Sequence, residues 1–291
     1  MKPSFAIVGC GKVGTALGKF LAGAGYRIAG LAGKNILSVK KAAQIIGTGK
    51  FGLVSREITK DADIVFITTP DNIISDTCDI ISQNNGFREN AVVLHCSGAL
   101  PSTILSSAKK CKTFTGSMHP LQSFTAGESD INPFENIIIS VEGESRAVNT
   151  AKKIAADLGA KCFTIGTEAK TAYHAAAVVA SNYLVTLLDL AFGLIEKAGI
   201  SGRDRFKVLK PLIEGTLSNI ENVGISEALT GPIARGDVET VQRHLNEIAL
   251  KTPKLMSLYK ALGYHTVDIA VKRGSIAKTT ADSLRDILRF Y

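Results

Sequence analysis

The chain has 291 residues, a formal net charge of +8 and 45% hydrophobic residues, values typical of a globular protein with room for two domains. We see no run of about 20 apolar residues and no secretion leader, so we expect a cytoplasmic protein without a membrane span. The basic residues form no tight run and aromatics are only 6%, which disfavours nucleic-acid binding. Five scattered cysteines predict reduced thiols rather than disulfides or a metal site: Cys10, Cys78, Cys96, Cys111 and Cys162.

The first predicted element is a dinucleotide-binding turn. A short apolar run at residues 6–8 leads into glycine-rich residues, and a periodic apolar segment follows at once. A strand, a glycine turn and a helix N-terminus are what a dinucleotide pyrophosphate needs, because backbone N–H groups there face the phosphates. The alternative is a glycine-rich turn of another α/β protein. The predicted cofactor contacts in this turn are Gly9, Cys10, Gly11, Lys12, Val13 and Gly14.

The second predicted strand, residues 26–31, favours NADP over NAD as the cofactor. The first 56 residues contain nine Lys or Arg and no Asp or Glu. An NAD site places a carboxylate near the end of this strand to bind the ribose diol, and none is available here. A 2′-phosphate would instead attract Lys34 and its neighbour Asn35. The alternative is that the lysines of this segment form a solvated face.

Strand-like and helix-like segments alternate as far as residue 166. Continuous apolar runs, typical of parallel strands buried on both faces, recur along this part of the chain. The later predicted strands are residues 62–68, 91–95, 113–118, 137–141 and 161–165, with a helix over residues 147–158. This alternation predicts an α/β Rossmann domain with a doubly wound, mostly parallel sheet.

Polar residues follow several of these strands, at the edge where open α/β sheets bind their ligands. The predicted cofactor contacts after the strand at 62–68 are Thr69, Pro70 and Asp71. Ser97 offers its hydroxyl to a substrate anion or simply forms a turn. His119 is a candidate to bind a substrate carboxylate or donate a proton, unless it only braces its own turn. We expect His95 to be structural.

After Gly166 the pattern becomes helical. A long segment rich in Ala, Leu and Val covers residues 169–198, and glycines or prolines, Gly263 among them, separate the helices that follow. The later predicted helices are residues 203–217, 238–250, 253–262 and 275–290. We therefore divide the chain into a dinucleotide-binding domain, residues 1–166, and a helical substrate domain, residues 167–291, with a cleft between them.

Polar side chains in the helical half are further candidates for the substrate site. His174 and Asn182 interrupt an apolar helix about two turns apart, where an isolated polar group either hydrogen-bonds within the core or faces a cleft. Arg235 lies in a helix-breaking stretch. Its guanidinium could clamp a carboxylate or phosphate, or pair with Asp237.

Several motifs together resemble a family of two-domain proteins that pairs a Rossmann-like N-terminal domain with a helical C-terminal domain of unknown function. The motifs are GCGKVG, CSGAL, HPLQSF, YHAAAVVASNYL and TGPIARGD, and the resemblance covers essentially the whole chain. The family is more distantly similar to pyrroline-5-carboxylate reductases, ketopantoate reductases and β-hydroxyacid dehydrogenases. The resemblance implies NADP binding, an all-helical C-terminal domain like that of 6-phosphogluconate dehydrogenase, and a homodimer formed through that domain.

One departure from these relatives bears on the reaction. β-Hydroxyacid dehydrogenases and ketopantoate reductases carry a catalytic lysine four residues before an asparagine on the long helix. If Asn182 corresponds to that asparagine, Val178 stands at the lysine position and His174 is the nearest substitute for the proton donor. Lys170 lies a further turn away and could not fill the same place without a change of register. The departure disfavours the hydroxyacid reaction and leaves reduction of a protonated imine open.

These patterns predict an NADP-dependent oxidoreductase that transfers hydride to or from a small carbonyl or imine substrate. The candidate catalytic residues are His119, His174, Ser97, Asn182 and Arg235. The alternative is a non-catalytic NADP-binding sensor or regulatory protein, which the missing lysine favours.

Overall fold

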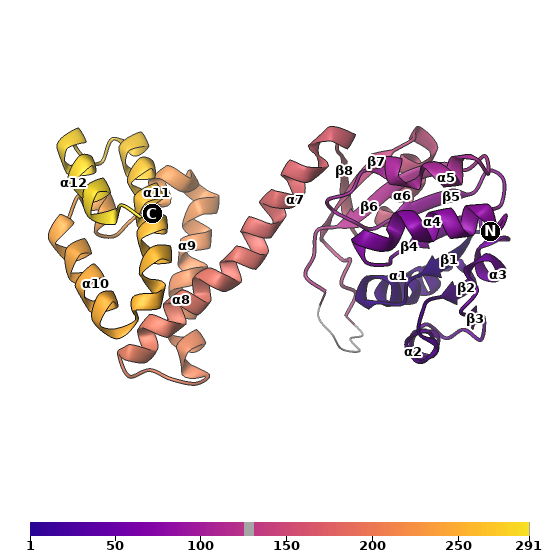
Figure 1. Cartoon of the computed structure of the whole chain (residues 1–291), viewed down its shortest axis with the longest axis horizontal. Helices are drawn as coiled ribbons and strands as arrows, with labels where there is room; N and C mark the ends of the chain where they lie inside the picture. Colours follow the sequence, from indigo (N-terminus) through magenta and orange to yellow (C-terminus); the bar gives the residue numbers. More distant parts are fainter. Residues whose placement is uncertain (125–130, 291) are drawn as a thin grey trace. The chain divides into compact units, whose positions relative to one another are not determined.

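The computed structural model describes residues 1–124 and 131–290. The chain divides into two compact units, Met1–Ser181 and Asn182–Tyr291, and Figure 1 draws the first from indigo through magenta and the second in orange and yellow. The change from strands to helices follows β8 (Lys161–Thr164). Helix α7 (Lys170–Val178) comes next, and by its contacts it belongs to the first unit.

The described residues of the first unit form one eight-stranded sheet in the order β3-β2-β1-β4-β5-β6-β7-β8 (Figure 1). The strands before β8 are β1 (Ser4–Val8), β2 (Arg27–Ala32), β3 (Phe51–Gly52), β4 (Ile64–Ile67), β5 (Val92–His95), β6 (Phe114–Pro120) and β7 (Ile138–Gly143). Neighbouring strands are parallel except β6 and β7. The predicted mostly parallel sheet is confirmed.

The direction of β7 differs from the sequence expectation. The apolar run at residues 137–141 predicted one more strand of the parallel type, but β7 is antiparallel to β6, with Ser117 opposite Glu142. A parallel neighbour needs a crossover of about a dozen residues, usually a helix. The described residues between β6 and β7 contain no helix. This part of the prediction is wrong, because an apolar run reports burial and not strand direction.

Helices cover both faces of the sheet, as the term doubly wound requires. Those on the first face are α1 (Lys12–Gly23), α2 (Ile36–Ile46) and α6 (Ser145–Asp157), and those on the second are α3 (Ser55–Thr59), α4 (Ile74–Gln83) and α5 (Ser106–Lys109). In β1 the side chains of Phe5 and Ile7 pack in the first layer and those of Ala6 and Val8 in the second. Burial on both faces explains why the strands are continuously apolar.

The described residues of the second unit are helical. The helices are α8 (Leu184–Lys197), α9 (Asp204–Ala228), α10 (Val238–Lys251), α11 (Met256–Arg273) and α12 (Lys278–Leu288). Helices α10, α11 and α12 share a small core that includes Val241, Val267 and Leu284. The prediction that Gly263 separates two helices is wrong, because α11 runs through it. A Cβ at Gly263 would lie 2.8 Å from a Leu288 methyl group, so this glycine permits close packing of α12.

The long apolar helical segment, Thr167–Lys197, corrects the expectation that no membrane-length run exists. The most apolar 18 residues of this segment have a mean hydropathy of 1.8, so the helix could cross a membrane by length and composition alone. It is one such helix in the part of the chain that the structure describes. Polar residues such as Asn182 and Asp189 interrupt the segment, but its many Leu, Val and Ala residues outweigh them in the average. A π-helical turn, Val179–Tyr183, lies between α7 and α8.

Helices α8 and α9 leave many apolar side chains exposed. Along its 25 residues, α9 buries none. The exposed apolar side chains of the two helices are Leu184, Val185, Leu187, Phe206, Val208, Leu212, Leu217, Ile220, Val223 and Ile225. We call this set the α8–α9 surface. Apolar surfaces of this extent usually mark an interaction site.

Candidate functional site

The glycine turn joins β1 to α1 at the carboxyl edge of the sheet. Gly9 has a φ of +111°, and a Cβ there would lie 2.6 Å from the Thr68 carbonyl carbon. A Cβ at Gly14 would overlap the Gly9 carbonyl oxygen and the Thr68 hydroxyl. That hydroxyl donates a hydrogen bond to the Gly9 carbonyl oxygen at 2.6 Å. Glycine is therefore required at both positions for the turn to fit beneath the end of β4.

The N-terminus of α1 is open to an anion. Gly11 is the N-cap residue, no side chain caps the helix, and its first turn contains no acidic residue. The N–H groups of Lys12 and Val13 therefore face outward with the positive end of the helix dipole. No described residue lies within 4 Å of a Cβ built at Gly11, so this part of the structure leaves the approach clear. This geometry fits a dinucleotide phosphate.

Cys10 has a structural place within the same turn. Its Sγ donates to the Ala32 carbonyl oxygen at 3.6 Å, which ties the turn to the end of β2. Burial raises the pKa of the Cys10 thiol to about 11, so it stays protonated. Only its backbone is suited to contact a phosphate.

A cavity of about 520 Å³ opens beside the turn. Its lining includes Gly11 and Lys12 of the turn together with Ser38 and Lys41 of α2. The described lining residues include no Asp or Glu. The described part of the lining is thus positively charged, and the cavity has a size that small-molecule sites commonly have.

The two residues predicted to bind a 2′-phosphate lie at the start of α2. Lys34 is exposed and is not among the lining residues of the cavity. Asn35 caps α2, since its Oδ1 accepts from the N–H groups of Leu37 at 2.9 Å and Ser38 at 3.1 Å. Its side-chain amide NH₂ remains for a ligand. Lys41, which lines the cavity, is an additional cation that the sequence analysis did not single out as a ligand.

The residues after β4 supply polar groups at the same edge. The Thr69 hydroxyl is buried and has no hydrogen-bond partner in the described part of the chain. Pro70 is exposed and precedes a 3₁₀ turn, Asp71–Ile73. The Asp71 carboxylate accepts a hydrogen bond from the Ser97 hydroxyl at 2.7 Å. An unpartnered buried hydroxyl at this position is one that a bound ligand would satisfy.

Lys170, the first residue of α7, is fully buried at this edge. Its side chain is 1% exposed, and its Nζ donates to the Ser97 carbonyl oxygen and to the Ser117 hydroxyl, both at 2.8 Å. Burial lowers the pKa of Lys170 to about 8, while the Glu142 carboxylate opposes the shift. A lysine with this pKa both gives and takes protons near neutral pH.

Sequence reasoning missed Lys170 because it used Asn182 as the reference for the family pattern. In the structure, a buried lysine instead stands four residues before His174. The available signal was a lysine at the start of an apolar helix, one turn before a histidine on the same side.

Glu142 reaches the site from the antiparallel strand. His95, Ser117 and Glu142 are neighbours across β5, β6 and β7. The Glu142 carboxylate accepts from the Ser102 N–H and hydroxyl at 2.9 and 2.7 Å, from Thr167 at 2.8 Å and from Ser117 at 3.1 Å. Burial alone would raise the pKa of Glu142, but these hydrogen bonds together lower it. The missed signal was a carboxylate within an apolar strand.

His95 and Cys96 are held in their neutral forms beside Lys170. His95 Nδ1 accepts from the Ser97 N–H at 3.1 Å, and burial lowers the pKa of His95 to about 4. Burial also raises the pKa of Cys96 to about 12. Neither side chain therefore competes with Lys170 as a cation or as an acid near neutral pH.

His119 and His174, both predicted site residues, come together over Gly98. Their ring centroids are 6.0 Å apart, and His119 Nδ1 is 3.0 Å from the Tyr173 hydroxyl. Burial, with Lys170 nearby, lowers the pKa of His119 to about 4, so the ring is neutral. His174 Nδ1 is buried without a partner among the described residues. A Cβ at Gly98 would lie within 2.8 Å of both rings, so glycine is needed there.

Asn182 and Arg235 belong to the second unit, and both are exposed. Arg235 ends a short 3₁₀ helix, Ile233–Arg235. Asp237 does not pair with Arg235 among the described residues; it caps α10 and accepts from the Thr240 N–H at 3.0 Å. The participation of Asn182 and Arg235 in a substrate site stays a prediction.

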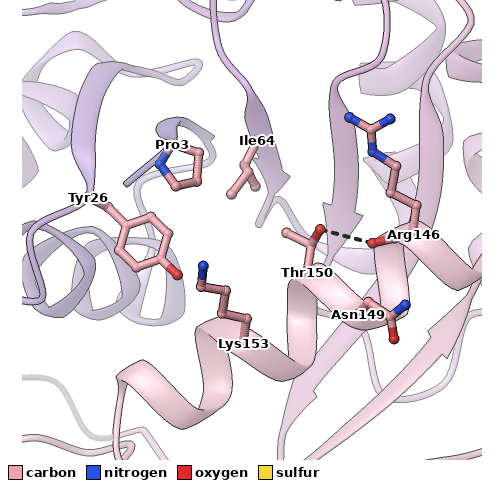
Figure 2. A pocket seen from close by; sticks show the side chains of 7 residues that line it. All are labelled: Pro3, Tyr26, Ile64, Arg146, Asn149, Thr150 and Lys153. Atoms are coloured by element: carbon pink, nitrogen blue, oxygen red, sulfur yellow. Dashed lines mark hydrogen bonds between the residues drawn. The ribbon is translucent and has the colours of Figure 1, made fainter. Parts of the chain in front are cut away.

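A second hollow, of about 410 Å³, lies at the opposite edge of the sheet (Figure 2). Pro3, Tyr26 and Ile64 place it beside the amino ends of β1, β2 and β4. Open α/β sheets bind their ligands at the carboxyl ends instead. The hollow is therefore not part of the candidate site.

Two protein-family models match the chain. A Rossmann-like domain model matches residues 2–120, and a domain of unknown function, DUF2520, matches residues 137–266. The chain therefore joins a Rossmann-like domain to a DUF2520 domain, the combination that its motifs indicated. No curated protein sequence matches it.

Solved structures share the fold over nearly the whole chain. BF3122 from Bacteroides fragilis, provisionally named an NADP oxidoreductase, is 24% identical with a TM-score of 0.76 and covers 92% of this chain and 98% of its own. Protein TM1727 from Thermotoga maritima is 28% identical with a TM-score of 0.68, and the match covers 93% of this chain and 99% of TM1727. A reductive aminase from Aspergillus terreus, solved with NADPH and ethyl levulinate, is 16% identical with a TM-score of 0.63 and covers 99% and 100%. These likenesses establish a dehydrogenase-like fold.

Proposed function

We propose that the chain is an NADP-dependent oxidoreductase acting on a small carbonyl compound or the corresponding alcohol. One observation carries the proposal: the buried Lys170 ammonium lies at the same sheet edge as the glycine turn and 2.8 Å from the Ser97 carbonyl oxygen. When bound, the nicotinamide would supply or accept the hydride. The protein then has to move one proton.

Lys170 is suited to move that proton. When a carbonyl group is reduced, its carbon gains a hydride and its oxygen gains a proton. Two of the three ammonium hydrogens have partners among the described residues, Ser97 and Ser117, which leaves one for a substrate oxygen. In the reverse direction, neutral Lys170 accepts the proton of the alcohol.

The charge of Lys170 favours a carbonyl substrate over an imine, the other substrate class that the sequence left open. A protonated imine is a cation, and a buried ammonium would repel it. A carbonyl oxygen is a hydrogen-bond acceptor and suits the neutral imidazole of His119 and the ring of His174, each of which can present an N–H. We assign these two histidines to substrate binding.

The cofactor contacts follow from the turn and the charged cavity. Backbone N–H groups at the start of α1 would hold the pyrophosphate, and the Thr69 hydroxyl would bind a polar group of the cofactor. Lys34, Lys41 and Ser38 would bind the 2′-phosphate. The lack of Asp and Glu among the described residues of the cavity lining supports NADP over NAD.

The test combines binding and turnover. Calorimetry with NADPH and NADH should show tighter binding of NADPH, and Lys34→Glu should weaken NADPH binding far more than NADH binding. Loss of NADPH absorbance is then followed with 2-oxo acids, aldehydes, ketones and cyclic imines, and we expect turnover of a carbonyl compound. Equal effects of Lys34→Glu on both dinucleotides would contradict the choice of NADP.

Turnover of cyclic imines alone would contradict the assignment of Lys170. Tight NADPH binding without turnover of any substrate class would instead support the alternative of a sensor or regulatory protein. The buried Lys170 argues against that alternative, since a non-catalytic site has no need of an acid with a lowered pKa.

We also propose that the chain forms a homodimer through its helical unit. The α8–α9 surface supports this, because apolar side chains such as Val185 and Leu212, each 68% exposed, are stabilised when a second copy covers them.

A further inference from the structure

The Ser117 hydroxyl lies between Lys170 and Glu142. Lys170 Nζ is 2.8 Å from Ser117 Oγ, which is 3.1 Å from a Glu142 carboxylate oxygen. An ammonium group can only donate, so Ser117 accepts from Lys170 and must give its own hydrogen to Glu142. The hydrogen bonds therefore run in one direction, from the lysine to the carboxylate.

Glu142 is fixed in this arrangement. It is 2% exposed, Ser117 is 1% exposed, and the hydroxyls of Ser102 and Thr167 occupy its other carboxylate oxygen. A carboxylate that accepts several hydrogen bonds keeps its charge near neutral pH. Glu142 is therefore a permanent buried anion rather than a proton donor.

We propose that Glu142 is a positioning residue: through Ser117 it holds the Lys170 ammonium in one orientation and sets the pH range in which Lys170 donates its proton. The lysine side chain has a long flexible stem, and a single bond to the Ser97 carbonyl oxygen would leave the ammonium free to swing. The second anchor, at Ser117, directs the remaining hydrogen. The inference rests on the proposed function, because it concerns the proton donor of that reaction.

Other ionisable groups around Lys170 do not substitute for Glu142. Asp71 is exposed and already accepts from the Ser97 hydroxyl. His95 and His119 are neutral near pH 7, and the Cys96 thiol is protonated. His174, on the same helix as Lys170, presents a buried ring nitrogen without a partner among the described residues.

The activity experiment compares Glu142→Gln with Glu144→Gln, the same change two residues further along. Glu144 accepts from the Thr115 N–H and has no contact with Lys170 among the described residues. Removing the Glu142 charge disfavours the ammonium form, so the alkaline limb of kcat/KM for reduction should move down by about one pH unit or more. At pH 8 the rate should fall about fivefold or more, with the KM for NADPH unchanged. Glu144→Gln should leave the limb in place.

Ser117→Ala gives a second variant that keeps the Glu142 charge and removes the hydroxyl between the two groups. It should move the limb in the same direction by a smaller amount. The melting temperature of each variant shows that it is folded, and if Glu142→Gln does not fold, Ser117→Ala decides the question.

A direct titration separates this inference from the proposed function. NMR of lysine side chains, with the Lys170 signal identified by its loss in Lys170→Met, follows the protonation of Lys170 without any turnover. If the protein reduces nothing, the proposed function fails while the titration still reports on Glu142. A folded Glu142→Gln protein with an unchanged Lys170 titration would overturn the inference, as would an unchanged alkaline limb.

Discussion

Burial sets the charge of several ionisable side chains around Lys170. It lowers the pKa of His119 to about 4 and raises that of the Cys96 thiol to about 12, so both are neutral at pH 7. Lys170 itself has its pKa lowered to about 8. Lys170 is therefore a titrating cation beside the neutral His119 and Cys96, and it is linked to the Glu142 carboxylate through the Ser117 hydroxyl.

Replacing Lys170 tests its assignment. Lys170→Met should lower kcat for carbonyl reduction by about 100-fold or more, because general acid catalysis typically contributes that much, while the Kd for NADPH stays the same. In the unmodified protein, the reduction rate should be level below pH 8 and fall about tenfold per unit above it, since only the ammonium form donates. Steady-state kinetics against pH provide the measurement.

Lys152→Met, at an exposed lysine of α6, is the matched control and should change neither the rate nor its pH profile. An active Lys170→Met protein with an unchanged alkaline limb would show that another group donates the proton.

At the level of single residues, the sequence supplied candidates at the carboxyl ends of strands. Ser97 and His119 could be named as candidates because the carboxyl ends of parallel strands meet at one edge. Lys170 and Glu142 come from a helix and from an antiparallel strand, so no spacing in the sequence relates them to that edge. Their importance depends on burial and on partners far away along the chain, which residue identity does not reveal.

At the scale of elements, one glycine of the turn is needed for folding and another for binding. Gly14 lies against the Gly9 carbonyl oxygen, whereas no described residue lies within 4 Å of a Cβ at Gly11. Gly11 and Gly14 are therefore required for different physical reasons, and substituting each of them distinguishes the two requirements.

Gly11→Ala should fold normally and bind NADPH at least tenfold more weakly, because its methyl group enters the space of the phosphates. Gly14→Ala should lower the free energy of unfolding by about 1–3 kcal/mol, the usual cost of overpacking. Urea denaturation and calorimetry measure the two quantities. Equal losses of stability in both variants would contradict this division.

The elements themselves were largely predictable, because runs of apolar residues report burial on both faces of a sheet. The direction of β7 was not, since it depends on the connection from β6 rather than on the residues of the strand. Gly263 shows the same limit for helices. A glycine that ends a helix and one that permits close packing look alike until the partner, Leu288, is known.

At the scale of the whole molecule, the α8–α9 surface predicts self-association. Light scattering after size-exclusion chromatography should show a dimer at micromolar concentration, and Leu212→Glu should convert it to a monomer, because a charge cannot be buried unpaired in an apolar interface. Leu250→Glu on α10, at a side chain that is 78% exposed, should leave the dimer intact. A monomeric parent protein would remove the proposal.

The antiparallel direction of β7 limits the changes of length that this sequence can accept during evolution. Side chains alternate between the two faces of the sheet along β7. Deleting one residue of this strand would therefore turn the Glu142 side chain toward the α6 layer. Val141 or Gly143 would then face the hydroxyls of Ser102 and Ser117. The residues just ahead of the strand are equally constrained, since Phe134 is fully buried and the Asn136 N–H donates to the Gly159 carbonyl oxygen. Among descendants of this gene, changes of length should therefore avoid residues 134–143.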